Sequence, residues 1–137
     1  MSKYLDKAKE LRNDPVMHYN CAQAVVLAFS EDLGIDEETL MKLTANFGGG
    51  MKMASICGTV TGGAMVLGLF GMDNVRALNL FYQKVKDRHE GLLMCADLLK
   101  LNASKGLPKK PHCDQMVYDS VQFVEEILQE QGILKPE

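Results

Sequence analysis

The chain has 137 residues, of which 47% are hydrophobic, and this is enough for one helical domain (1–137) that buries its core without disulfides or metals. Its formal net charge of -3 argues against binding to nucleic acid or to an anionic membrane. We expect no membrane span, because the longest uncharged run is rich in glycine, serine and threonine. The N-terminus MSKYLDKAKELR lacks the apolar segment of a secretory signal, so we expect a cytoplasmic protein with reduced thiols.

The first third of the chain has the apolar spacing of amphipathic helices. Tyr4, Leu5, Ala8 and Leu11 share one face of the first, which stops before a proline. The second is apolar nearly all round, which predicts a helix in the middle of the domain. The predicted helices span residues 3–12, 21–33 (capped by Asn20 and ended by Gly34) and 37–46 (capped by Asp36).

The stretch from residue 47 to residue 71, FGGGMKMASICGTVTGGAMVLGLFG, is the most unusual part of the sequence. We expect a buried helix that Ser55 caps and that ends before Gly71. Each interior glycine costs about 1 kcal/mol against alanine, so something must come close to this helix in return. Gly58 and Gly62 lie one turn apart on the same face, where another backbone or a flat cofactor could approach. Cys57 lies beside them in the first turn.

The rest of the chain again predicts helices, and no segment alternates as a strand would. The expected ranges are 74–90 (capped by Asp73), 95–101 and 115–131 (capped by Asp114). The loop from 102 to 112 carries several lysines, which would lower the pKa of a thiol that follows it. The sequence therefore predicts an all-α bundle of five or six helices with a glycine-rich central helix.

Four cysteines fall at or just before the starts of predicted helices: Cys21, Cys57, Cys95 and Cys113. None of them forms a C-x-x-C pair, so their spacing alone is weak evidence for a site. Free backbone N–H groups and the helix dipole stabilise thiolates at such positions. A helical bundle can bring several helix starts together, so we expect the four thiols to meet at one end.

Other local motifs carry less weight. His18 and Cys21 form an H-x-x-C pattern that could be half of a metal site, but a histidine there is more often a capping or packing residue. The glycines at 48–50 could expose several N–H groups to an anion, but no phosphate-loop motif accompanies them. The methionines nearby are typical of adaptable core filling, although a soft metal would accept them.

The cysteine-containing blocks resemble a known family. Cys21 in NCAQAV, the run GGGM followed by Cys57-Gly58-Thr59-Val60-Thr61-Gly62, and Cys95 and Cys113 ahead of helices are similar to the redox-active proteins named for a C_GCAxxG_C_C pattern. The resemblance covers about residues 20–128. The family has C-G-A-x-x-G around its second cysteine, and Thr59 stands here in place of the alanine. The resemblance implies a small, mostly bacterial or archaeal redox protein that uses the four cysteines, without an established reaction.

Three functional hypotheses follow. The first is a thiol-based redox or electron-transfer protein, an oxidoreductase in the broad sense, whose cysteines cycle as disulfides or hold an iron-sulfur cluster. Gly58, Thr59 and Gly62 would then line the cofactor or admit a redox partner protein or a small thiol. The second is a zinc or other soft-metal protein with the same four ligands, and the third is a helical interaction module, homodimeric or not, with cysteines as core filler. The sequence alone does not choose among them.

Overall fold

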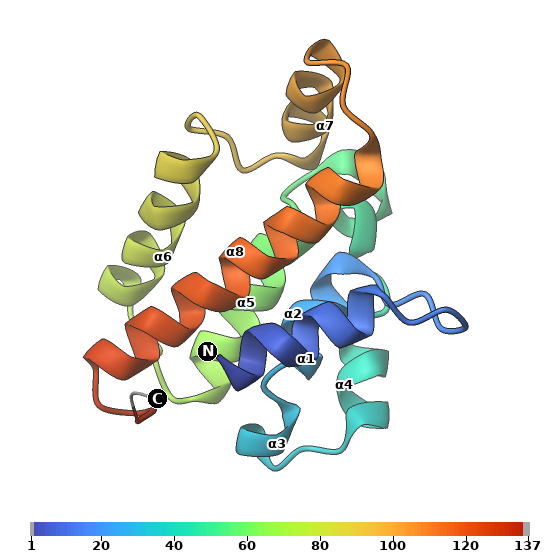
Figure 1. Ribbon diagram of the computed structural model, residues 1–137. Helices are drawn as coiled ribbons and strands as arrows, with labels where there is room; N and C mark the ends of the chain where they lie inside the picture. Colours follow the sequence, from blue (N-terminus) through green and yellow to red (C-terminus); the bar gives the residue numbers. More distant parts are fainter. Residues whose placement is uncertain (1, 136–137) are drawn as a thin grey trace.

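The computed structural model describes residues 2–135 and is built from helices (Figure 1). Within that range there is no strand, only an isolated antiparallel bridge between Ile56 and Met94. The all-α class predicted from the sequence is therefore confirmed. None of the helices described is long and apolar enough to cross a membrane. The elements are α1 (Lys3–Arg12), α2 (Cys21–Leu27), α3 (Ser30–Leu33), α4 (Glu37–Thr44), the π-helical turn η1 (Gly50–Ala54), α5 (Gly58–Leu69), α6 (Val75–Arg88), α7 (Cys95–Ser104) and α8 (Lys109–Glu130).

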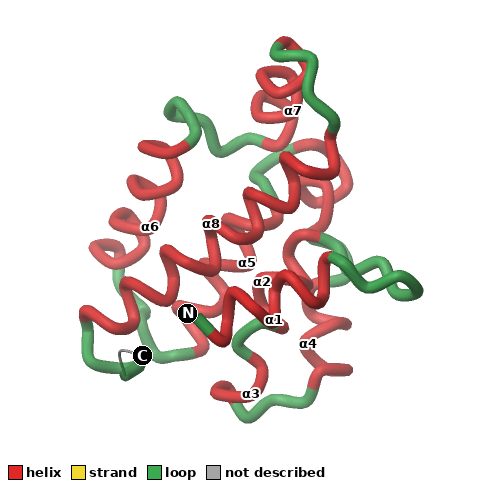
Figure 2. The backbone as a smooth tube through the Cα atoms, viewed as in Figure 1, coloured by secondary structure: helices red, strands yellow, loops and turns green. Residues whose placement is uncertain are grey.

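The core lies where α2, α5 and α8 pack together, with α1 and α6 against α8 (Figure 1). The side chains of α2 are buried from Ala22 to Leu27, as its all-round apolar pattern predicts. The long helix α8 buries Val117, Val121, Val124 and Leu128, which have the spacing of one helical face. Loops join the ends of these helices, as Figure 2 shows. The first residue of each helix therefore lies at an end of the bundle.

Two helix starts agree with the sequence because the caps are local. The Asn20 side chain accepts a hydrogen bond from the backbone N–H of Gln23, and the side-chain oxygen of Gln23 accepts one from the backbone N–H of Asn20. Asp36 caps α4, because its carboxylate accepts hydrogen bonds from the backbone N–H and the hydroxyl of Thr39. The bounds of α1 are those expected from the sequence.

The expected number of five or six helices is wrong, because nine helical segments lie between residues 2 and 135. The helix expected over 21–33 breaks after Leu27, and the chain re-forms a short turn, α3, that ends at left-handed Gly34. The glycine run adds the turn η1, and residues 49–52, from its N-cap onward, have φ between 58° and 63°. Met51 and Lys52 thus adopt the left-handed conformation that side chains disfavour.

Several helix starts also differ. Ser55 does not cap α5, because the chain stays extended through residues 55–57 to form the bridge with residues 93–95, so Cys57 is the N-cap. Asn74, not Asp73, caps α6 through the N–H of Ala77. Helix α8 begins at Lys109 after Pro108, not at Gln115, because a proline in the first turn, here Pro111, removes no hydrogen bond that the helix could make. Asp114 therefore lies inside the helix and caps nothing.

Candidate functional site

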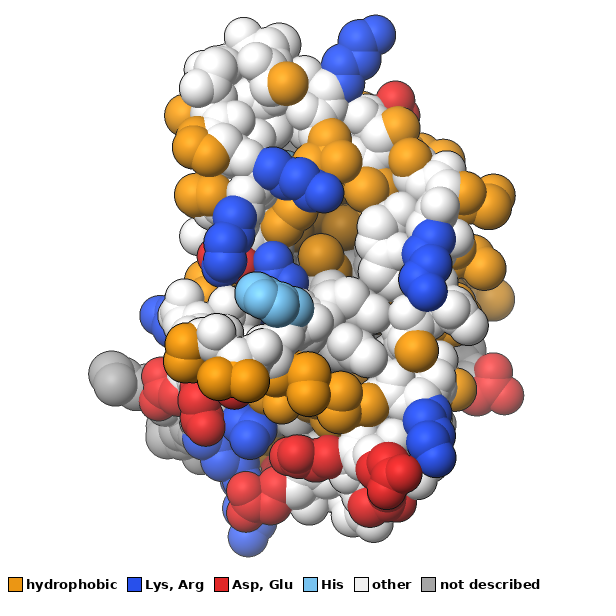
Figure 3. All heavy atoms as spheres, turned by 90° about the vertical axis from the view of Figure 1, so that its right-hand side faces the viewer, with side chains coloured by type: hydrophobic (Ala, Val, Ile, Leu, Met, Phe, Trp, Pro, Cys, Tyr) orange, Lys and Arg blue, Asp and Glu red, His pale blue; other side chains and the backbone are white. Residues whose placement is uncertain are grey.

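All four cysteines line one cavity of about 480 Å³. Each comes from a different element: Cys21 is the first residue of α2, Cys57 the N-cap of α5, Cys95 the first residue of α7, and Cys113 lies in the second turn of α8. Figure 3 shows the face of the molecule on the side of the 47–55 turn and the start of α8, with a hollow whose walls are largely apolar. Residues far apart in the sequence thus meet at one end of the bundle.

Glycines let the cysteine-bearing segments approach one another. A Cβ on Gly58 would lie 2.7 Å from the carbonyl oxygen of Phe47 and 3.4 Å from the Cβ of Cys21. A Cβ on Gly50 would lie 2.9 Å from the Cβ of Cys95 and nearer still to the backbone of Ser55. Real Cβ atoms do not approach backbone atoms this closely, so these two positions need glycine. The missing side chains bring α5 against Cys21 and the glycine turn against Cys95.

Backbone hydrogen bonds hold the segments of Cys57 and Cys95 together. The N–H of Cys57 donates to the carbonyl of Leu93 at 2.9 Å, and the N–H of Cys95 donates to the carbonyl of Ser55 at 2.7 Å. These bonds flank the bridge between Ile56 and Met94. In an antiparallel pair, this register places Cys57 and Cys95 diagonally on one face, a relationship that leaves Cβ atoms roughly 7 Å apart. That separation exceeds what a disulfide spans without a backbone shift.

Cys21 and Cys113 line the same cavity and act strongly on each other. The interaction with Cys21, with the positive charges of Lys109 and Arg12, lowers the pKa of the Cys113 thiol below its ordinary value. The same interaction and burial raise the pKa of Cys21 far above it. Cys113 is therefore the thiol of this pair that ionises first.

The other two thiols, Cys57 and Cys95, hold their protons more tightly than Cys113 does. Burial raises the pKa of Cys57, whose Sγ lies 3.1 Å from the hydroxyl of Thr59, and that contact opposes the rise only in part. Burial also raises the pKa of Cys95, and the neighbouring sulfur charges of Cys57 and Cys21 add to the effect. The basic-loop hypothesis from the sequence thus holds for Cys113, whose neighbour Lys109 lies on the same helix.

Of the three residues predicted to bind a cofactor, only Gly58 lines the cavity. Gly62 faces the backbone of α2, where its Cβ would lie 3.2 Å from the carbonyl oxygen of Ala22. Thr59 is fully buried, and its carbonyl accepts a hydrogen bond from Ser120. Another helix backbone, rather than a flat ligand, therefore occupies the bare face at Gly62.

A family model described as "Putative redox-active protein (C_GCAxxG_C_C)" matches residues 19–127. The chain belongs to this family. The matched range takes in all four cysteines and the Cys57–Gly62 block, so the family segment and the cavity coincide. No significant match was found among the curated proteins or among the solved structures.

The thiols of this family member are free, and the described part of the chain contains no group of three or more His, Cys, Asp or Glu side chains placed to hold a metal ion. Four thiolates are the ligand set of zinc and of iron-sulfur clusters. Here the strongest interaction among the four thiols joins two of them, Cys21 and Cys113. His18 does not line the cavity, so the H-x-x-C motif does not extend the donor set.

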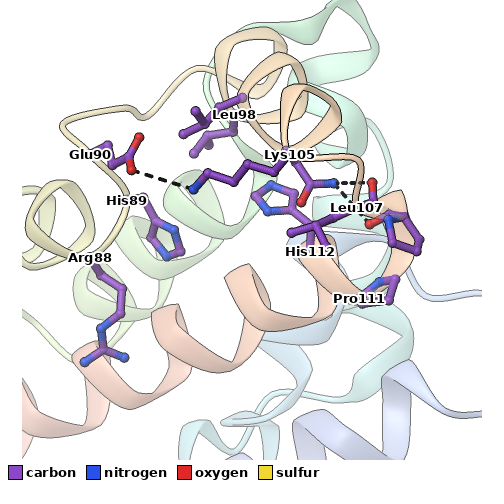
Figure 4. Close-up of a pocket in the computed structure, with 11 residues that line it drawn as sticks. Arg88, His89, Glu90, Leu98, Lys105, Leu107, Pro111 and His112 are labelled. Carbon is purple, nitrogen blue, oxygen red and sulfur yellow. Dashed lines mark hydrogen bonds and ion pairs between the residues drawn. The ribbon is translucent and has the colours of Figure 1, made fainter.

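A second cavity of about 340 Å³ adjoins the first, and sequence reasoning missed it (Figure 4). His112 lines both cavities, and burial together with the charges of His89 and Lys105 lowers its pKa. His89 also lines the second cavity, and its Nε2 lies 2.8 Å from Oδ2 of Asp119, whose side chain is only 3% exposed. This pairing depends on how the end of α6 meets α8, a tertiary contact that has no local sequence pattern.

Proposed function

We propose that this protein is a thiol–disulfide oxidoreductase in which Cys113 is the attacking thiol and Cys21 the resolving thiol. The observation that carries the proposal is that Cys21 and Cys113 shift each other's pKa in opposite directions, in a cavity that all four cysteines line. Such an interaction requires the two thiols to be neighbours, as does formation of a disulfide between them. Membership of a family described as redox-active supports the same class of chemistry.

The exchange runs in two steps. The Cys113 thiolate forms a bond to one sulfur of a substrate disulfide, the substrate S–S bond breaks, and the other half leaves as a thiolate that takes up a proton. Cys21 then loses its proton and attacks the Cys113 sulfur, which releases the second half of the substrate as a thiol. Two electrons pass to the substrate, which becomes two thiols, and the protein is left with a Cys21–Cys113 disulfide. A dithiol partner protein or a small thiol reduces that disulfide again.

The environments of the two thiols suit these roles. The lowered pKa of Cys113 makes it a thiolate at a pH where an ordinary thiol is largely protonated. Cys21 keeps its proton until the mixed disulfide removes the negative charge next to it, since the partner thiolate is what mainly raises its pKa. The order of attack therefore follows from the electrostatics of the pair. Cys57 and Cys95 are the remaining thiols of the cavity and form the less closely placed pair.

The test is the reaction of the reduced protein with the neutral probe bis(2-hydroxyethyl) disulfide, followed by mass spectrometry of the peptides. We expect a disulfide between Cys21 and Cys113, no reaction at neutral pH in Cys113→Ser, and arrest at a mixed disulfide in Cys21→Ser. Cys95→Ser is the matched control and is expected to react as the unmodified chain does. Oxidation of Cys113→Ser at the unmodified rate would overturn the assignment.

The same preparation decides between disulfide chemistry and a bound metal. Anaerobically purified protein is expected to be colourless, free of stoichiometric iron or zinc, and to gain free thiols on reduction. Visible absorption with iron would support an iron-sulfur cluster instead, and stoichiometric zinc would support a metal-binding protein. Thiols that react only after denaturation would leave the interpretation of the cysteines as core filler.

A further inference from the structure

The cysteine cavity is positively charged although the whole chain carries a net charge of -3. Its walls include the cationic side chains of Arg12, Lys52 and Lys109, and none of the described residues that line it is Asp or Glu. Lysine and arginine side chains surround the hollow in Figure 3. A concave site lined by one sign of charge raises the local concentration of ligands of the opposite sign.

The positive charge of Arg12 is already paired within the protein. Its Nε lies 2.7 Å from Asp114 Oδ1, and one of its terminal nitrogens donates to the carbonyl of Tyr19 at 2.9 Å. Arg12 is therefore neutralised in place and ties α1 to α8. The charges that remain for a ligand belong to the two lysines.

Lys52 and Lys109 have no carboxylate partner within residues 2–135. The ammonium group of Lys52 meets only the neutral side-chain oxygen of Asn46, at 3.0 Å. The side chain of Lys109 makes no hydrogen bond or ion pair there, yet its charge acts on Cys21, Cys95 and Cys113. By contrast, the adjacent Lys110 pairs with Asp114 at 2.9 Å and does not line the cavity.

The spacing of Lys109 and Cys113 fixes where an anionic group would lie. The two residues are four apart in α8 and therefore share a face, one helical turn from each other. A ligand whose sulfur reaches Cys113 would place a carboxylate a few bonds further along next to Lys109. Lys52, on the turn η1, supplies the second positive charge at the cavity wall.

The size of the cavity limits what can enter. A volume of about 480 Å³ lies in the range for small-molecule sites, roughly 300–1,000 Å³, and is too small for a folded domain. Apolar wall residues such as Leu98, Leu99 and Met116 suit the methylene groups between sulfur and carboxylate. These features describe a small, flexible, anionic disulfide.

We propose that the substrates of the cysteine cavity are low-molecular-weight disulfides that carry carboxylate groups, and that Lys109, with Lys52, recognises those carboxylates. This inference rests on the proposed thiol–disulfide function for the reaction, but the preference for carboxylates rests on the cavity itself. Lys109 and Lys52 are binding residues in this scheme and take no part in the exchange of sulfur atoms.

The test compares three disulfides of matched length and different charge: 3,3′-dithiodipropionate (dianion), bis(2-hydroxyethyl) disulfide (neutral) and cystamine (dication). The unmodified reduced protein is expected to react with the dianion about tenfold faster than with the neutral probe and slowest with the dication, since one well-placed charge contact is worth about that factor. The ratio should fall as salt is added. Equal rates for the three probes would overturn the inference and leave the proposed function intact.

Variants of the lysines identify which of them recognises the carboxylates. Lys109→Gln is expected to abolish most of the preference and Lys52→Gln part of it, whereas Lys110→Gln is the control that retains it. The quantity compared is the ratio of dianion to neutral rates at one pH, because loss of the Lys109 charge also changes how readily Cys113 ionises, and that effect cancels in the ratio. An unchanged ratio in Lys109→Gln would refute the role of this residue.

Binding of suberate separates this inference from the reaction. Suberate has the length and charge of 3,3′-dithiodipropionate but no sulfur, so it probes recognition alone. We expect it to slow alkylation of Cys113, with about tenfold weaker protection in Lys109→Gln. If the protein reduces none of the disulfides, the proposed function fails, and suberate then decides this inference by itself. Absence of protection in the unmodified chain would overturn it.

Discussion

The side chains of Cys21 and Cys113 interact, although one residue opens α2 and the other lies in the second turn of α8. The interaction makes the two thiols differ in acidity, because the pKa of Cys113 falls while that of Cys21 rises. Neither the start of α2 nor the start of α8 produces this difference in pKa by itself. It requires α2 and α8 to pack side by side against α5.

The first prediction concerns that interaction. Cys21→Ala removes the neighbouring thiol, so the pKa of Cys113 should rise towards its ordinary value, and alkylation of Cys113 by iodoacetamide should need a higher pH to reach half its maximal rate. Cys21→Ser keeps a hydroxyl donor and should give an intermediate midpoint. Because Lys109 and Arg12 remain, part of the lowering should persist in both variants. A midpoint that is the same in all three proteins would contradict the coupling.

Local chemistry in the sequence was enough to predict α1, the caps Asn20 and Asp36, and the all-α class. It was not enough for the start of α8, since two prolines and a glycine made residues 105–111 resemble a loop. Because that start was misplaced, the helical spacing between Lys109 and Cys113 could not be recognised. Reading Pro111 as a first-turn proline would have revealed it.

The cavity itself could be anticipated only in outline. Helix starts tend to lie at the ends of a bundle, and the glycines indicated that other segments approach closely. Which segment lies against each glycine depends on tertiary packing. Gly62 admits α2, Gly58 admits Phe47 and Cys21, and the aromatic ring of Phe81 occupies the space beside Gly63. The side-chain contacts of the second cavity join α6 to α8 and follow from tertiary packing alone.

The second prediction contrasts two glycines of α5. Gly62→Leu should destabilise the protein by roughly 1–3 kcal/mol, because its Cβ would press on the backbone of Ala22 and force α2 and α5 apart. Gly68→Ala should instead stabilise it by up to about 1 kcal/mol, since Gly68 lies in the same helix with nothing within 4 Å of its Cβ. Urea unfolding measures both changes. If both variants changed the free energy of unfolding in the same direction, close approach would not be what distinguishes these positions.

The third prediction concerns the left-handed backbone beside the cavity. Ala54 has a φ of 57° and is exposed, so Ala54→Gly should relieve about 1–2 kcal/mol of backbone strain while adding roughly 0.5–1 kcal/mol of unfolded-chain entropy. The net expectation is a stabilisation of about 0.5–1 kcal/mol, measured by urea unfolding. The matched control is Ala103→Gly in the exposed part of α7, which should lose about 1 kcal/mol. A loss of stability in both variants would mean that the backbone is not strained at Ala54.

The fourth prediction concerns Asp119, the buried carboxylate that pairs with His89 beside the second cavity. It accepts hydrogen bonds from Arg88 at 3.1 Å and from Gln115 and His89 at 2.8 Å each. Burial alone would raise its pKa, but these partners outweigh burial, and the pKa of Asp119 lies below its ordinary value. A carboxyl group with a lowered folded-state pKa adds stability above its unfolded pKa, near 3.8, and loses that contribution as the pH falls through the folded-state pKa.

Asp119→Asn should therefore lower the free energy of unfolding by roughly 1.5–3 kcal/mol at pH 7, since charged hydrogen-bond partners lose their acceptor. The difference from the unmodified chain should shrink as the pH is lowered below 4, because Asp119 of the unmodified protein then becomes protonated as well. Urea unfolding at pH 7, 5 and 3 measures this. Glu130→Gln, an exposed carboxylate at the end of the same helix, is the control and should change stability by no more than about 0.5 kcal/mol. A deficit in Asp119→Asn that stays constant down to pH 3 would show that the loss comes from packing rather than from the charge of Asp119.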